Sequence, residues 1–182
     1  PGHGHGHGLE IFSLQDPANP KFVSRIKFPP LYEIGNDMWG VTVTGDHAFV
    51  ADTYNGAFVV NVADPHQPII VSRCQLPQVK ERGSAGFVGG LTLVQDHVYL
   101  AGGYTDLHVV PVSGVARRPL AEANESPVLG KPGDNPDARI QYHRYRPAGQ
   151  VHGVALLKND RALVACGSAG VHVITIHPEI RR

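Results

Sequence analysis

A repeat with a fixed spacing constrains the fold of this chain more than any single motif does. The segment "GLEIFSLQDPANPKFVSRIKFP" begins at Gly8, and "GAFVVNVADPHQPIIVSRCQLP" begins 48 residues later, at Gly56. Both contain an Asp-Pro-x-x-Pro turn, at Asp16 and Asp64, and then Val-Ser-Arg. Self-similarity at such a period is typical of repeat architectures, so the repeat predicts the fold before any site is considered.

Two further copies of this segment are less complete. One begins as "DLHVVPV" at Asp106, lacks the Asp-Pro turn, and resumes at "QYHRYRP", where Pro147 takes the place of Pro77. A polar insertion at 113–138 separates its two parts. Another copy begins as "GVHVITI" at Gly170. Because long loops on rigid scaffolds often carry recognition, the insertion is a candidate binding loop.

The segments between the copies also match one another. They are "WGVTVTGDHAFVADTYN" from Trp39, "GGLTLVQDHVYLAGGYT" from Gly89 and "HGVALLKNDRALVACGSA" from His152. Each indicates two strands joined by a tight polar turn, where Asp or Asn tolerates left-handed geometry and hydrogen-bonds the local backbone.

One repeat therefore predicts four short strands, which in the best-preserved copy are 41–44, 47–52, 57–62 and 69–76. Their nearly continuous apolarity indicates sheets covered on both faces. Four strands in a period of about 48 residues are typical of a β-propeller blade, so we expect an all-β propeller of four-stranded antiparallel blades. A β-sandwich is the alternative, but a sandwich gives no reason to repeat turn chemistry at a fixed spacing.

The repeat divides the chain into a Gly/His-rich leader or tag at 1–7 and a propeller segment at 8–182. The segment comprises a partial blade at 8–29, a blade at 39–77, a blade at 89–147 that contains the insertion, and a partial blade at 152–182. Propellers close with about four to eight blades. Since this chain has only three to four, we expect it to form part of a larger ring, completed by remaining blades or by a second chain.

The best-preserved copy, "VTVTGDHAFVADTYNGAFVVNVADPHQP" from Val41 to Pro68, resembles the LVIVD type of bacterial and archaeal propeller repeat. Asn61 departs from the family pattern, which often has Asp there. The resemblance implies a propeller fold and a non-catalytic interaction or binding module with a protein partner. It also implies a secreted, periplasmic or cell-surface location.

Charge and composition bear on the partners. Lys plus Arg and Asp plus Glu number 16 each, so net charge gives no sign of a nucleic-acid partner. No run approaches the ~20 apolar residues that span a bilayer, so we expect no membrane span. Cys74 and Cys166 form neither a CxxC motif nor a disulfide framework.

The first candidate site is the entrance of the propeller channel, where the innermost strands begin. Asp37, Trp39, Phe87 and His152 stand just before these strands and are predicted to surround one mouth. A purely structural role is the alternative, because no acid/base pair is apparent and the residues differ between blades. No nucleophile motif is present either, so the sequence favours a binding module over an enzyme.

The second candidate is the run "GHGHGHG" at 2–8, in which His3, His5 and His7 alternate with glycine. Imidazoles suit a transition metal such as copper, nickel or zinc, which suggests an alternative function as a metal-binding or redox propeller. A purification tag explains the same pattern. His108 and His172 align in the third strand of their blades, where we expect partly buried histidines rather than ligands.

Overall fold

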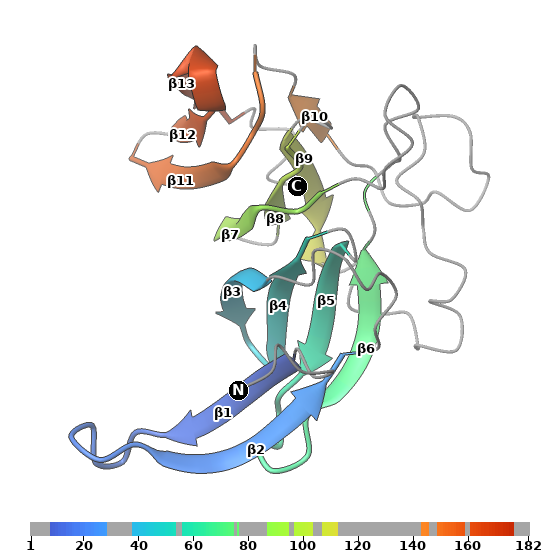
Figure 1. Ribbon diagram of the computed structural model, residues 1–182, viewed down its shortest axis with the longest axis vertical. Helices are drawn as coiled ribbons and strands as arrows, with labels where there is room; N and C mark the ends of the chain where they lie inside the picture. The colour runs from blue at the N-terminus through green and yellow to red at the C-terminus, as the bar shows by residue number, and fades with distance from the viewer. Residues whose placement is uncertain are drawn as a thin grey trace.

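The computed structural model describes residues 8–28, 38–53, 56–74, 76, 87–94, 97–103, 107–112, 143–145, 149–158 and 161–176. Within these ranges the fold is all-β. Thirteen strands form small antiparallel sheets, here named sheets 1 to 4 in chain order, which lie one above another along the long axis of the molecule (Figure 1).

Each sheet is built from strands that follow one another in the sequence. Sheet 1 contains β1 (Gly8–Ser13) and β2 (Lys21–Lys27), and sheet 2 contains β3 (Met38–Thr44), β4 (His47–Asp52), β5 (Gly56–Asn61) and β6 (Ile69–Cys74). Sheet 3 contains β7 (Gly90–Val94), β8 (His97–Ala101), β9 (Leu107–Pro111) and β10 (His143–Tyr145). Sheet 4 contains β11 (Gly153–Leu157), β12 (Arg161–Ala165) and β13 (Val171–Thr175), and the short 3₁₀ helix η2 (Gly167–Ala169) connects β12 to β13.

The predicted all-β class and the predicted four-stranded antiparallel unit are confirmed in sheets 2 and 3. The strands of sheet 2 lie within three residues of the predicted bounds. In sheet 3, β9 pairs with β10 across the predicted insertion, which itself lies outside the described residues. The described residues do not close into a ring.

The Asp-Pro turns have the same geometry in sheets 1 and 2. The backbone N–H of Ala18 donates to Oδ1 of Asp16 over 3.1 Å, and that of His66 donates to Oδ1 of Asp64 over 2.9 Å. Asp16 and Asp64 thus each accept a hydrogen bond from the backbone of their own turn. These carboxylates satisfy the backbone donors of the turn, so the motif serves architecture.

The sheets pack face to face through three apolar clusters. One joins sheets 1 and 2 and includes Phe28 and Phe58, whose rings stack with centroids 4.4 Å apart. A second joins sheets 2 and 3, and a third joins sheets 3 and 4. The middle strands β4, β5 and β8 are buried along almost their whole length, which explains their nearly continuous apolarity.

The first strand of each of sheets 2 to 4 lies on the same side of the stack. Strand β7 lies beside β3 and also beside β11, so these three strands form a row down one edge (Figure 1). In a propeller the first strand of each blade lines the channel. The mouth of the channel that the sequence predicts would therefore lie at one end of this row.

Candidate functional site

Backbone bridges tie sheet 2 to sheet 3 and sheet 3 to sheet 4 at the end of the row where β3, β7 and β11 begin. The N–H of Val88 donates to the carbonyl of Thr53 over 2.9 Å, which joins sheet 2 to sheet 3. Gly103 and Val151 exchange two such bonds, of 2.8 and 2.9 Å, between sheets 3 and 4. These bonds fix the backbone on which the predicted mouth residues stand.

Trp39 and Phe87 come into contact at this end of the row. Their rings meet edge to face, with centroids 6.0 Å apart and an interplanar angle of 63°. Trp39 remains 55% exposed. Sheet 2 supplies the indole and the segment leading into β7 supplies the phenyl ring, so the pair spans two sheets and presents an aromatic surface to solvent.

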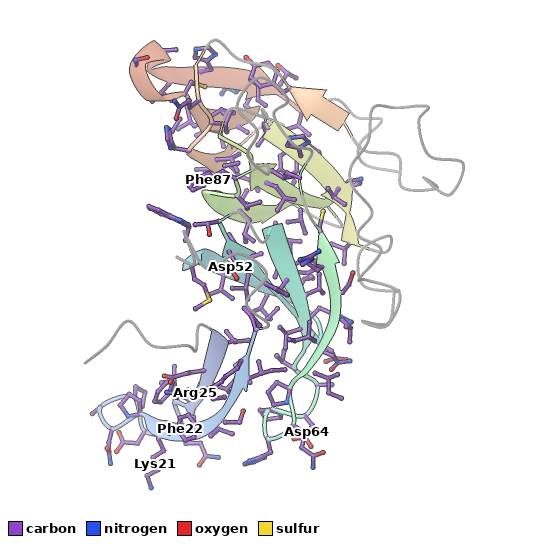
Figure 2. The ribbon with its side chains drawn as sticks, turned by 45° about the vertical axis from the view of Figure 1, so that its right-hand side comes forward. Lys21, Phe22, Arg25, Asp52, Asp64 and Phe87 are labelled. Carbon is purple, nitrogen blue, oxygen red and sulfur yellow. The ribbon has the colours of Figure 1, made fainter. Side chains whose placement is uncertain are left out.

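The absence of side chains at two glycines leaves room for the Phe87 ring. A Cβ at Gly89 would lie 2.5 Å from Cε1 of Phe87, and one at Gly103 would lie 3.3 Å from Cδ1. The phenyl ring therefore rests directly on backbone that carries no side chain. Figure 2 shows Phe87 at sheet 3 and Asp52 at sheet 2, on the same side of the stack.

His152 stands on sheet 4, at the position that Trp39 and Gly89 hold in the preceding sheets. It is exposed, and its Nε2 would lie 3.5 Å from a Cβ at Gly167. The structure thus brings Trp39 and Phe87 into contact and places His152 on the next sheet of the same row. Asp37, the fourth predicted mouth residue, lies outside the described residues.

Sequence reasoning missed Asp52, the last residue of β4, and Thr53, which follows it. Asp52 is fully buried and pairs with Met38, and Thr53 has a positive φ of 31°. The repeat does contain a signal, because Gly103 and Gly167 hold the position of Thr53 and both have φ of 58°. A β-branched residue at a place where other copies have glycine marks local strain.

No group of three or more His, Cys, Asp or Glu side chains in the described ranges could hold a metal ion. His3, His5 and His7 lie outside these ranges, so the metal interpretation stays a prediction. His108 is fully buried on the face of sheet 3 that packs on sheet 2, opposite Arg144 of β10. Nδ1 of His172 lies 3.4 Å from the hydroxyl of Tyr145, between sheets 3 and 4.

The cysteines are both buried and unbridged. Burial raises the pKa of Cys74 to about 12, with the Arg73 guanidinium opposing part of that effect. Burial also raises the pKa of Cys166, whose Sγ lies 3.4 Å from the carbonyl of Val164. A high thiol pKa leaves little thiolate near neutral pH, so neither group suits a nucleophile.

Residues 35–75, which contain β3 to β6, match the LVIVD repeat family. This chain carries an LVIVD repeat. The predicted resemblance is confirmed for that segment, which supplies Trp39, Asp52 and Thr53 of the site. A comparison with curated proteins finds no match for the chain. Within the described ranges, no helix has the length and apolarity to cross a membrane.

Proposed function

We propose that this chain is a segment of a β-propeller that acts as a non-catalytic binding module of a secreted or cell-surface protein. Its ligand or protein partner binds at the row where β3, β7 and β11 begin. The observation that carries the proposal is the exposed Trp39 ring, held against Phe87 on a backbone that hydrogen bonds tie from sheet to sheet. A rigid, half-exposed aromatic pair offers a large contact area at a small entropic cost.

The outer face of sheet 4 is apolar and uncovered, which supports the proposal that the chain is a segment of a propeller. Val171 and Val173 of β13 are exposed there, whereas Ala57 and Val59, which hold the same places in β5, are buried against sheet 3. Another sheet packed on sheet 4 would bury the two valines in the same way. The mass of the chain in solution tests whether a second chain supplies this covering sheet. A second chain would double the mass of 19.6 kDa, whereas a sheet that belongs to further blades of a longer polypeptide would not.

The same relation holds at the other end of the stack. Phe12 and Phe22 pair edge to face on the outer face of sheet 1 and are exposed, while their counterparts Val60 and Ile70 pack against Phe28. Large apolar patches of this kind on a soluble protein mark interaction surfaces. Both ends of the stack therefore favour an assembly larger than the described sheets.

The binding row is tested through the single tryptophan of the chain, Trp39. Its emission is followed while oligosaccharides, short peptides and fractions of secreted protein are added in turn. We expect a saturable change with one probe class, with Trp39→Ala or His152→Ala weakening binding at least tenfold when an independent assay such as calorimetry is used. Lys21→Ala, an exposed residue of sheet 1 outside the row, is the control. Equal binding by the mouth variants and the wild type would exclude this site.

Catalysis is tested in the same experiment. Mass spectrometry of the bound probe after prolonged incubation should show it chemically unchanged. A product that forms with the wild type and not with His152→Ala would show that the protein is an enzyme and not a binding module.

A further inference from the structure

Trp39 is the extra residue of a β-bulge in β3. The residues on either side of it, Met38 and Gly40, pair with consecutive residues of β4, which are Asp52 and Ala51. Bulges change the direction of a side chain, interrupt the hydrogen bonding of a strand, and are frequent beside functional sites. The bulge therefore sets the indole apart from the regular side-chain alternation of sheet 2.

The glycine that follows Trp39 borders open space. Nothing lies within 4 Å of the place that a Cβ at Gly40 would take. Its counterpart in sheet 3, Gly90, is different, because a Cβ there would lie 3.2 Å from the carbonyl oxygen of His152. The close approach of sheet 4 thus explains the glycine in β7, whereas packing explains none at Gly40.

Backbone conformation does not explain Gly40 either. Some bulges need glycine because one of their residues takes a positive φ, but Gly40 does not have one. Glycine weakens a strand, and where conformation and packing do not require it, it marks a place where another group approaches the backbone closely. The bare backbone beside the indole therefore indicates room for a ligand.

Phe87 restrains the indole on one side of this space. Its ring lies over Gly89 and Gly103 and meets Trp39 edge to face, with centroids 6.0 Å apart. Trp39 nevertheless remains 55% exposed. A restrained, exposed indole can stack on a ligand with a small loss of side-chain freedom.

The described residues at this end of the row carry little charge. They contain no Lys, Arg or Glu, and their one aspartate, Asp52, is fully buried; the ranges concerned are 38–40, 52–53, 87–90, 101–103, 149–153 and 165–167. His152 is exposed, and its imidazole can donate or accept a hydrogen bond. This surface suits a neutral ligand that has an apolar face and hydrogen-bonding groups at its rim.

We propose that Trp39 and the bare backbone at Gly40 bind a neutral sugar ring of an oligosaccharide; this inference rests on the proposed binding row and names its ligand class. The C–H groups on one face of a pyranose are slightly positive and meet the negative face of the indole. The hydroxyl groups at the edge of the ring then lie beside the peptide groups of Gly40, where no side chain keeps them away. His152, further along the row, suits a hydroxyl of a second sugar unit.

Two other classes of ligand fit these residues less well. An extended peptide would add to the edge of β3, where the bulge at Trp39 interrupts the hydrogen bonding. A nucleobase can stack on an indole, but its phosphates are usually held by Lys or Arg, which the described ranges at this end of the row lack.

The ligand class is tested by calorimetry with the whole chain. The probes are short neutral oligosaccharides of glucose, mannose and galactose in α and β linkage, an extended peptide, and a single-stranded DNA oligonucleotide. We expect saturable binding of at least one saccharide, which also protects Trp39 from quenching by acrylamide. Its affinity should change less than about twofold between about 0.05 and about 0.5 M sodium chloride, because an uncharged ligand has no interaction that salt screens.

Gly40→Val tests the bare backbone. Since the space is open and β-branched residues suit strands, the variant should unfold at the same urea concentration as the wild type or a higher one. It should weaken saccharide binding at least about tenfold, because its side chain occupies the place of the sugar beside the indole. Trp39→Ala should weaken binding as strongly, which keeps the test decisive if Gly40→Val is less stable than expected.

Thr175→Ile is the matched control, because it enlarges an exposed residue of β13 that pairs with Arg161, at the end of sheet 4 away from the row. It should change saccharide binding less than about twofold. Saccharide binding that Trp39→Ala or a folded Gly40→Val leaves unchanged would overturn the proposal, as would failure of every saccharide to bind. If the peptide or the oligonucleotide binds instead and Trp39→Ala weakens it, the binding row stands and the assignment to sugars is wrong.

Discussion

Thr53 and Gly103 hold the same position in successive repeats, and both have a positive φ, 31° and 58° respectively. Each follows the second strand of its sheet, and each bonds through its backbone to the segment that leads into the next sheet. The chain must take this conformation for the sheets to join. Glycine adopts it freely, whereas a β-branched residue is strained by about 1–2 kcal/mol.

Replacing Thr53 with glycine should therefore not destabilise the protein. Relief of the strain offsets the loss of a buried methyl group and the larger freedom of the unfolded chain. We expect a free energy of unfolding between that of the wild type and about 1 kcal/mol above it, measured by urea denaturation. Thr42→Gly, within β3, is the control and should cost about 1 kcal/mol. Equal losses in both variants would show that Thr53 is not strained.

Two phenylalanines in sheets 1 and 2 should differ strongly in their contribution to stability. Phe58 is buried and stacks on Phe28, whereas Phe22 is 58% exposed beside Phe12. Phe58→Ala should lower the free energy of unfolding by about 3–5 kcal/mol, because it leaves a cavity between the two sheets. Phe22→Ala should lower it by less than about 1 kcal/mol. Similar losses would mean that the outer face of sheet 1 is already covered in solution.

Much of the fold could be predicted from the sequence because the repeat copies local chemistry. The turns at Asp16 and Asp64 have the same side-chain hydrogen bonds, and the strands between Val41 and Cys74 follow from alternation and turn residues. Local hydrogen bonds and period-2 patterns need no knowledge of distant residues, so they can be found by reading along the chain.

The site was predicted only in part because it depends on how neighbouring sheets meet. The alignment placed Trp39 and His152 at equivalent positions, but the contact of Trp39 with Phe87 requires the space over Gly89. The strain at Thr53 is a backbone property that residue type alone does not report. The exposure of the valines of β3 could not be inferred either, because they have the same pattern as the covered leucines of β7.

Cys74 should make the protein less stable at alkaline pH. Burial raises the pKa of its thiol from 9.0 to about 12, so between these values the unfolded chain loses the proton while the folded chain keeps it. The contribution of this thiol is complete below about pH 9 and falls by up to about 1.4 kcal/mol per pH unit as the pH rises toward 12. Cys74→Ala should show a correspondingly flatter loss of unfolding free energy from pH 9 upward. Parallel pH profiles would contradict the burial of this thiol.

Gly89 should control the aromatic surface of the candidate site. A methyl group there would lie 2.5 Å from the Phe87 ring, so Gly89→Ala must displace the ring and break its contact with Trp39. Because Trp39 is the single tryptophan, its emission should shift to longer wavelength as it becomes more exposed. Gly153→Ala is the matched control, since nothing lies within 4 Å of its added methyl group. An unchanged spectrum in Gly89→Ala, or the same shift in Gly153→Ala, would show that Phe87 does not position the indole.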